Sequence, residues 1–115
     1  MTPSQIFVEA ANERAVIEDS RGRRLEVRKL TPVDTLRLLK AAGPALSENN
    51  AWLNMAALAM AVTAIADVPV PAPVTEGQIE AIIGQLQDEG VAAVSNWSET
   101  LRNASDAEVA ATAGN

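Results

Sequence analysis

The first half of the chain contains a short stretch in which polar and apolar residues alternate one by one. In residues 24–28 every second side chain is apolar, a period of two that is typical of a half-buried strand. A second β-prone run precedes it at residues 15–17, and Ser20 and Gly22 between the two runs are residues that tight turns favour. Residues 14–30 are therefore predicted to form a β-hairpin.

Helical spacing begins directly after this hairpin. Thr31 can accept a hydrogen bond as a helix cap, and Pro32 suits the first helical position because its missing amide donor is not needed there. Gly43 and Pro44 then favour a stop, since glycine adopts the left-handed conformation easily and proline cannot continue a helix. A helix is predicted over residues 32–42.

The strongest helical periodicity lies in the last third of the chain. Thr75 and Gln78 match the spacing of a capping box, and apolar residues then recur every three or four positions, which predicts a helix over residues 76–87. The polar segment 88–90 ends in glycine and is interpreted as a break. A second amphipathic helix is predicted over residues 90–103, antiparallel to the first.

Residues 49–66 form the most unusual segment, because these eighteen residues carry no charge. Their length approaches the roughly 20 apolar residues that cross a bilayer. However, Asn54 interrupts the segment and no Lys or Arg anchors either end, so no membrane association is expected. A helix is predicted over residues 50–66, which is either the central helix of a bundle or, in part, a contact surface for another chain.

Prolines at every second position follow this segment, at residues 69, 71 and 73. Alternating prolines fix the backbone torsion φ and keep each preceding residue out of the helical region, so residues 67–73 are predicted to be extended and stiff. Two interpretations stay open for them: a plain spacer between helices, or a pre-ordered apolar strip that contacts a partner.

Together these elements predict a mainly α fold: a small helical domain of about four helices with an N-terminal β-hairpin, in the α+β class. At 115 residues one domain is expected, and it is predicted to cover residues 14–103. Residues 1–13 are interpreted as an N-terminal arm. Residues 104–115 are small and polar without periodicity, and are predicted to be a disordered tail.

The composition narrows the possible chemistry. The chain has no Cys and no His, which excludes thiolate and imidazole metal sites and every Ser-His or Cys-His catalytic pair. Neighbouring carboxylates, such as those at residues 18–19 and 88–89, are explained by turns and exposed helix faces. The sequence has no glycine-rich phosphate-binding motif. We therefore expect no enzyme activity, no catalytic residue, no metal and no cofactor.

Charge is distributed unevenly along the chain. The net charge is −6, yet residues 1–40 carry eight basic and six acidic residues, whereas residues 41–115 carry one basic and nine acidic residues. A nucleic-acid binder needs a basic face. The cluster of Arg21, Arg23 and Arg24 is interpreted as a charged hairpin tip, because acidic residues surround it and no aromatic residue is interleaved for base stacking. Binding of nucleic acid is not expected.

Several short motifs, taken in their order along the chain, resemble one protein family. They are the hairpin with Asp19-Ser20-Arg21-Gly22-Arg23 and Val27-Arg28-Lys29-Leu30, the Leu36-Arg37-Leu38 helix, the apolar helix with the proline-rich stretch 64–73, and the later stretches 78–81 and 86–90. Over residues 14–102 the chain is similar to the tail assembly chaperones of long-tailed phages and prophages.

This resemblance implies a non-virion protein of the host cytoplasm that binds the tape measure protein, keeps it soluble and promotes assembly of the tail tube around it. The N-terminus has no signal-peptide pattern, in agreement with that location. In many members of the family a programmed frameshift adds a C-terminal extension that engages the tail tube protein, which makes that protein a second candidate partner. A homo-oligomer is a further option.

The apolar surface that grips such a client is expected between Asn49 and Pro73, with tryptophans as further anchors. Two other interpretations stay open: a structural tail or head-tail subunit that remains in the virion, and a small helical nucleic-acid-binding regulator. The predicted partner-binding residues are Trp52, Met55, Leu58, Met60, Val68, Val70 and Trp97.

Overall fold

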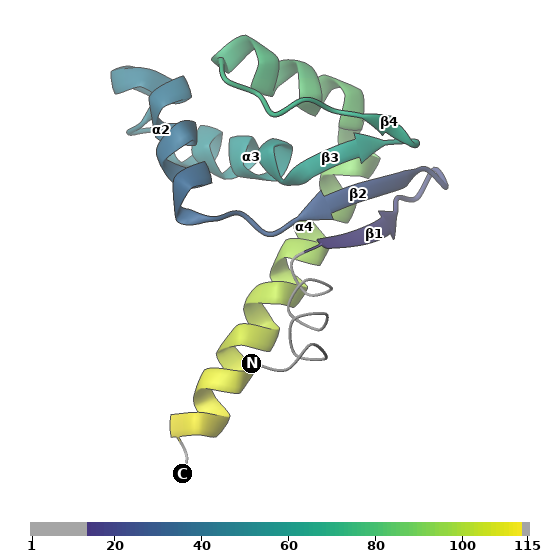
Figure 1. Cartoon of the computed structure of the whole chain (residues 1–115), viewed down its shortest axis with the longest axis vertical. Coiled ribbons are helices and arrows are strands. Elements are labelled where there is room, and N and C mark those ends of the chain that lie inside the picture. Colours follow the sequence, from purple (N-terminus) through teal and green to yellow (C-terminus); the bar gives the residue numbers. More distant parts are fainter. Residues whose placement is uncertain (1–13, 114–115) are drawn as a thin grey trace.

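Three helices and a four-stranded antiparallel sheet make up the part of the chain that the structure describes (Figure 1). This computed structural model describes the backbone of residues 14–113 and the side chains of residues 14–104, so the predicted arm at residues 1–13 lies outside it. The fold is α+β, with the strand order β1-β2-β3-β4. The predicted mainly α domain of four helices is therefore wrong: within the described residues there are two more strands and one helix fewer than expected.

The N-terminal hairpin forms as the alternating pattern predicts. Strands β1 (Arg14–Glu18) and β2 (Arg24–Arg28) pair antiparallel in continuous register. The loop between them closes around the buried carboxylate of Asp19, which accepts hydrogen bonds from the backbone amides of Arg21 and Arg23 at 3.0 and 2.9 Å. A buried side chain therefore holds this loop together.

Helix α2 (Pro32–Leu46) begins where the capping pattern predicts, but it runs past the predicted end. The Thr31 hydroxyl accepts from the Asp34 amide at 3.3 Å, and the Asp34 carboxylate accepts from the Thr31 amide at 2.7 Å. Gly43 leaves the helical conformation with a φ of 75°, and Pro44 restarts the helix at a position that needs no amide donor. The Gly-Pro pair therefore interrupts the helical geometry at Gly43, where the sequence predicts the stop, and α2 continues beyond this kink to Leu46.

The charge-free segment divides into two elements, and the single helix predicted over residues 50–66 is wrong. Helix α3 (Asn50–Ala61) is followed at once by strand β3 (Val62–Ile65), which pairs with β2. Three of the four β3 residues are β-branched and three of the four are buried. The sequence of a strand that is buried on both faces is a nearly unbroken apolar run. Periodicity therefore does not distinguish such a strand from a buried helix.

A second hairpin, absent from the predicted fold, is built on β3. Strand β4 (Val68–Pro69) pairs with β3 across a two-residue turn at Ala66 and Asp67. Both turn residues have a positive φ, 51° and 66°, the geometry that matches the twist of a hairpin. The stretch expected to be a plain extended connector therefore begins by adding an edge strand to the sheet.

Helix α4 (Glu76–Ala113) spans both helices predicted over residues 76–87 and 90–103. Its N-terminal start agrees with the predicted capping pattern. The break predicted at residues 88–90 lies slightly too late in the chain, because these residues are helical and the helical geometry is interrupted at Gln87 instead. The helix also covers residues 104–113, for which the sequence pattern predicts a disordered tail.

One residue interrupts the helical geometry of α4. Gln87 has a φ of 58° and a ψ of −174°, and the chain changes direction there (Figure 1). We call residues 76–86 the first arm of α4 and residues 88–113 the second arm. Gly90 packs so closely after the kink that a Cβ there would lie 2.9 Å from the Leu86 Cβ, which explains the glycine in this position.

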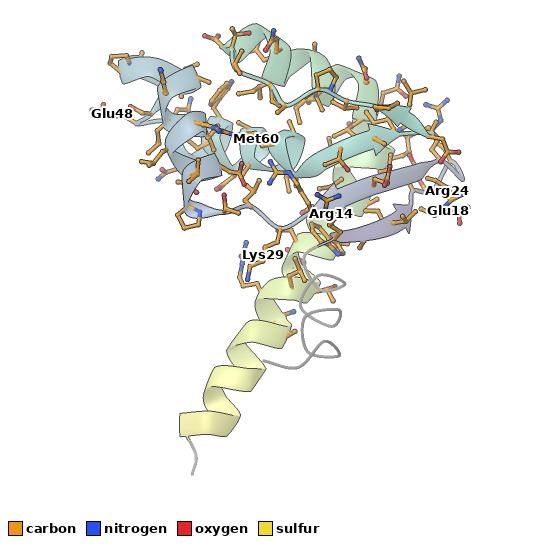
Figure 2. All side chains as sticks on the ribbon, in the orientation of Figure 1. Arg14, Glu18, Arg24, Lys29, Glu48 and Met60 are labelled. Atoms are coloured by element: carbon orange, nitrogen blue, oxygen red, sulfur yellow. The ribbon has the colours of Figure 1, made fainter. Side chains whose placement is uncertain are left out.

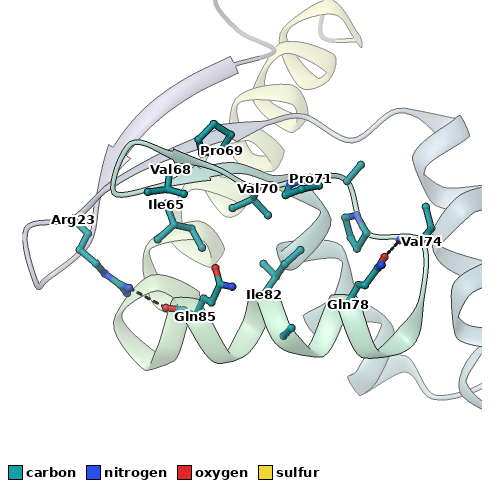
Figure 3. Close-up of a pocket in the computed structure, with 13 residues that line it drawn as sticks. Arg23, Ile65, Val68, Pro69, Val70, Pro71, Val74, Gln78, Ile82 and Gln85 are labelled. Carbon is teal, nitrogen blue, oxygen red and sulfur yellow. Dashed lines mark hydrogen bonds between the residues drawn. The ribbon is translucent and has the colours of Figure 1, made fainter.

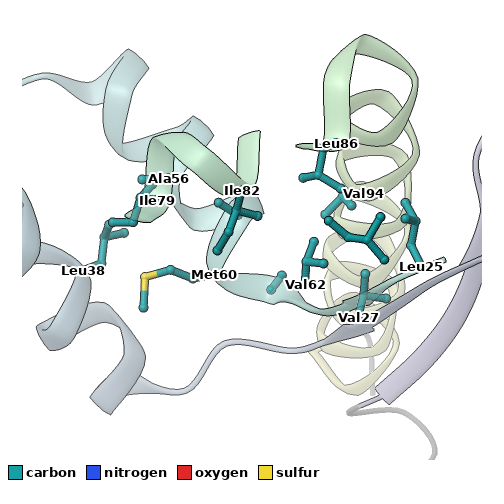
Figure 4. Packing of buried hydrophobic residues seen from close by; sticks show 13 residues of the cluster. Leu25, Val27, Leu38, Ala56, Met60, Val62, Ile79, Ile82, Leu86 and Val94 are labelled. Atoms are coloured by element: carbon teal, nitrogen blue, oxygen red, sulfur yellow. The ribbon is translucent and has the colours of Figure 1, made fainter. Parts of the chain in front are cut away.

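The hydrophobic core lies where the sheet meets α3 and both arms of α4 (Figure 4). Leu25 in β2, Leu86 in the first arm and Val94 in the second arm are fully buried, and burying a side chain of this size stabilises the fold by roughly 1.5–3 kcal/mol. The kink thus lets both arms pack on one cluster. The buried members are Leu25, Val27, Leu38, Ala56, Ala59, Met60, Ala61, Val62, Ile65, Ile79, Ile82, Leu86 and Val94.

Candidate interaction surface

An apolar groove of about 660 Å³ lies between the proline-rich segment and the first arm of α4 (Figure 3). We call it the proline groove; it is lined by Arg23 and by residues 65, 68–74, 78, 81, 82 and 85. Aliphatic side chains face it from both sides, including Val70 and Ile82 in Figure 3. Most of its lining is apolar, so it can accept apolar side chains of a partner.

Backbone and capping hydrogen bonds hold the proline-rich segment in place. The Val70 amide donates to the Thr63 carbonyl at 2.9 Å, which keeps the segment beside β3. The Val74 amide donates to the Gln78 side chain at 2.8 Å, and the Gln78 amide donates to the Thr75 hydroxyl at 3.2 Å. The residues that predict the start of α4 therefore also tie the segment to that helix.

The outer edge of this segment lacks amide donors at two successive outward positions. In an antiparallel strand, backbone groups point alternately toward the paired strand and away from it. Since the Val70 amide points toward β3, residues 69 and 71 face outward, and both are prolines without an amide. A partner would therefore contact this edge mainly through side chains rather than as an added strand.

Two valines at the ends of the proline groove are strongly exposed. Val68 is 64% exposed and Val74 is 70% exposed. Val68 and the half-buried Val70 belong to the predicted partner-binding set, and the structure brings them together here. Val74 is missing from that set, although its place at the end of the proline-rich segment is visible in the sequence.

A second groove, about 340 Å³ in volume, runs beside the second arm of α4. Leu58 of α3 and Trp97 of α4 both line it and are half-buried. Two further predicted residues are thus neighbours, although they are far apart in the sequence. Lys29 and Arg102 also line this groove, so it has basic groups beside an apolar floor.

Trp52 and Met55 lie at a third, smaller hollow of about 230 Å³ between α3 and the first arm of α4. The indole Nε1 of Trp52 donates to the Glu80 carboxylate at 3.3 Å, and Met55 is 44% exposed. The seven predicted residues therefore do not form one continuous surface.

Met60 is the exception among the predicted partner-binding residues, because only 4% of its surface is exposed. It shares the buried side of α3 with Ala56 and Ala59, at the spacing of one helical face, and lies beside Leu38 of α2 in Figure 4. The structure thus places Met60 in the core and not on the surface expected for it. A helix that is apolar all round does not reveal which of its sides is covered.

Another apolar surface, on α2, is absent from the predicted set. Leu36 is 68% exposed and Val33 is 53% exposed, whereas Asp34 and Leu38 face the core. The stripe formed by Val33, Leu36 and Leu39 is visible in the sequence at helical spacing. The sequence does not show that the neighbouring side of α2, with Leu38, is the one that packs into the core.

Arg23 connects the loop of the first hairpin to the kink of α4. Its side chain donates to the Asp19 carboxylate at 2.7 Å and to the carbonyls of Gln85 and Leu86 at 2.9 and 2.5 Å. These carbonyls lie in the last turn before Gln87 leaves the helical conformation, where a helix end needs donors and favours a cation. Arg23 is therefore a helix cap supplied by a distant loop, and only partly a charged hairpin tip.

Two buried aspartates are held in their ionised form. Burial alone would raise the pKa of Asp19, but hydrogen bonds from the amide and guanidinium of Arg23 outweigh this effect and lower the pKa. The two hydrogen bonds from Arg28, at 2.7 and 3.0 Å, hold the pKa of Asp34 well below its usual range. Both carboxylates are thereby occupied with holding the hairpin loop and the start of α2.

Neither a metal centre nor a membrane span is evident in the described part of the chain. Residues 14–104 contain no cluster of three or more acidic, His or Cys side chains suited to a metal ion. No helix within residues 14–113 has both the length and the apolar character needed to cross a membrane.

Comparison with known proteins gives no match: no family model, no curated protein and no solved structure matches this chain. Function has to be inferred from the chain's own residues and surfaces.

Proposed function

We propose that the chain is a tail assembly chaperone that binds the tape measure protein of a long-tailed phage or prophage and keeps it soluble until the tail tube forms around it. The ordered motifs that resemble this family support the proposal. The structural observation that supports it best is the proline groove, an apolar groove with exposed valines at its ends.

The shape of the proline groove suits an amphipathic helix. A long helical client presents apolar side chains every three or four residues, and such anchors bind in an apolar groove. A stiff extended segment forms one wall of the proline groove, and the first arm of α4 forms the other.

The outward prolines favour a helix over a strand as the bound segment. A strand added to a sheet edge binds mainly through backbone hydrogen bonds, and Pro69 and Pro71 have no amide to donate. A helix already satisfies its own backbone groups and needs only side-chain contacts. Gln78 and Gln85 at the groove can hydrogen-bond with polar residues that flank the apolar stripe of a client.

The net charge of −6 supports the same role. A carrier that covers an apolar client has to stay dispersed while it does so, and net charge far from zero opposes association and precipitation. The proposed chaperone therefore combines a local apolar groove with a charged remainder.

Co-expression with the tape measure protein tests the proposal. The unmodified chain should raise the soluble yield of that protein and co-purify with it. The double variant Val68→Asp, Val74→Asp places two carboxylates at the groove, where client binding would desolvate them, and should weaken binding at least about tenfold. The soluble yield should then fall to the level seen without the chaperone.

Val33→Asp on α2 is the matched control, because Val33 is also an exposed valine, at 53%. It should leave the yield unchanged, and an equal loss would contradict the placement of the site in the proline groove. If the unmodified chain does not raise the soluble yield of the tape measure protein, the chaperone function itself is contradicted. Mass spectrometry of purified particles adds a second test, because a chaperone should be absent from them and a virion subunit present.

A further inference from the structure

Strand β1 forms the other edge of the sheet, and among the described residues no strand pairs with its outer side. One hydrogen bond on the neighbouring strand gives the direction of its backbone groups. The Arg24 carbonyl accepts from the Ala66 amide at 2.8 Å, so the backbone of Arg24 points toward β3 and away from β1. Glu18, the partner of Arg24 in the hairpin, therefore points its own amide and carbonyl outward.

The alternation of the antiparallel ladder extends this result along β1. Every second residue shares the direction of Glu18, so Val16 and Arg14 also present their amides and carbonyls outward. The side chains of the same three residues occupy the exposed face of the strand, and Val16 is 53% exposed. The edge thus offers backbone donors, backbone acceptors and an apolar side chain together.

The sequence of β1 is complementary to itself in antiparallel orientation. Arg14 and Glu18 lie at opposite ends of the strand (Figure 2), two residues on either side of Val16. When Val16 stands opposite Val16 of a second copy, each Arg14 stands opposite a Glu18, and Ala15 stands opposite Ile17. A parallel orientation, or a shift by two residues, loses both charge pairs.

We propose that β1 is a self-association edge, through which two copies of the chain pair antiparallel around Val16 and join their sheets. Both copies use the same surface, so the arrangement has two-fold symmetry and closes at a dimer. A pair of five-residue strands buries less surface than a typical stable dimer does, so the association is weak and depends on concentration.

Neither Arg14 nor Glu18 forms an ion pair within the described part of the chain, although Glu18 stands opposite Arg24 of β2. Among the described side chains, both ion pairs lie elsewhere, in the hairpin loop and at the start of α2. The β1 edge also lies across the sheet from β4 and the proline groove. Self-association is therefore independent of client binding, and either proposal can fail without the other.

Sedimentation velocity over a range of concentrations tests the pairing with charge reversals. Arg14→Glu and Glu18→Arg each place like charges opposite one another, and the association constant of each variant should fall at least about tenfold. The double variant R14E/E18R restores both charge pairs and should associate like the unmodified chain. An equimolar mixture of the two single variants should also associate, because their pairs are again opposite in charge.

Arg37→Glu is the matched control, since Arg37 is exposed on α2 and the change in net charge equals that of Arg14→Glu. It should leave the association constant unchanged. The proposal is wrong if the unmodified chain stays monomeric at the highest concentration it tolerates, if the single variants associate as well as the unmodified chain does, or if their mixture does not associate. Circular dichroism of each variant separates a lost contact from a lost fold.

Val16→Pro supplies a test that does not depend on charge. The substitution removes an outward amide and leaves the hydrogen bonds between β1 and β2 in place, so the hairpin should form and the association should be lost. A folded V16P variant that still forms the dimer would overturn the proposal.

Discussion

The two edges of the sheet have opposite backbone chemistry. At β1 the outward positions, Arg14, Val16 and Glu18, have amides, whereas at β4 the outward positions 69 and 71 are prolines. An edge with outward amides accepts another strand, and an edge of prolines rejects one. A small sheet can thus separate two kinds of contact: backbone pairing at one edge and side-chain contact at the other.

The two hairpins that carry these edges also differ at their turns. The loop between β1 and β2 is closed by the buried carboxylate of Asp19, and its left-handed position is occupied by Gly22 with a φ of 80°. The turn between β3 and β4 places Ala66 and Asp67 in the left-handed region without a glycine. The first turn therefore depends on charge, and the second contains local backbone strain.

The largest change in stability should come from a substitution in the core rather than at either edge of the sheet. Leu25 in β2 is fully buried and pairs with Ile65 in β3, so Leu25→Ala should lower the free energy of unfolding by about 2–5 kcal/mol. Val16→Ala at the β1 edge should lower it by less than about 1 kcal/mol, because Val16 is half exposed. Urea denaturation followed by tryptophan fluorescence measures both values. Equal losses would show that the β1 edge belongs to the core.

Acid should loosen the first turn before the second. The pKa of Asp19 is lowered in the folded chain, so its stabilisation is complete above the ordinary aspartate pKa and is lost as the pH falls through the folded value. Asp19→Asn lacks this charge at every pH. Its stability deficit, about 1–3 kcal/mol near neutral pH, should therefore shrink in urea titrations at about pH 3.

Amide hydrogen exchange locates the acid effect within the molecule. The Arg23 amide is bonded to the Asp19 carboxylate, whereas the Val70 amide is bonded to a backbone carbonyl. Protection of the Arg23 amide should fall more on acidification than protection of the Val70 amide. An equal fall at both amides would mean that the hairpins open as one unit.

Restoring amides at β4 should make that edge behave like the β1 edge. The double variant Pro69→Thr, Pro71→Thr adds two outward donors, and light scattering should detect new association that rises with concentration. Val68→Thr alters the same strand without adding an amide. This variant should associate no more than the unmodified chain does. If the double variant does not associate further, missing donors are not what protects this edge.

The smallest changes in stability should come from substituting the residues that adopt the left-handed conformation in the two turns. Gly22→Ala should lower the free energy of unfolding by about 1 kcal/mol, and Ala66→Gly should raise it by about 0.5–1 kcal/mol. Thermal unfolding measured side by side resolves changes of this size. If Ala66→Gly lowers the stability, the strain ascribed to the second turn is absent.

Elements whose causes lie within a few residues were predictable from the sequence. The alternation in residues 24–28 predicts the first hairpin, and Thr31 and Pro32 predict the start of α2, and both predictions are confirmed. The predicted mainly α fold misses the second half of the sheet because β3 has the same apolar composition as α3 before it. Only pairing with β2 distinguishes the two, and that partner lies far away in the sequence.

The sequence indicates which apolar residues are candidates for contact, but not how they are arranged on the surface. Val68 and Val70 do line a common groove, and Leu58 and Trp97 line another. Met60 lies in the core, on the side of α3 that faces Leu38 of α2. A nearly uniform apolar helix contains no signal for which side its neighbours will cover.

The sequence by itself determined which chemical groups the protein has: no His or Cys, prolines at alternate positions of one segment, and opposite charges at the two ends of β1. The tertiary structure decided where those groups point. Arg23 caps the first arm of α4 through a carbonyl 63 residues away, and the outward amides of β1 follow from the pairing of β2 with β3. Propensities and caps act over a few residues, whereas burial and strand pairing depend on residues that only the folded chain brings together.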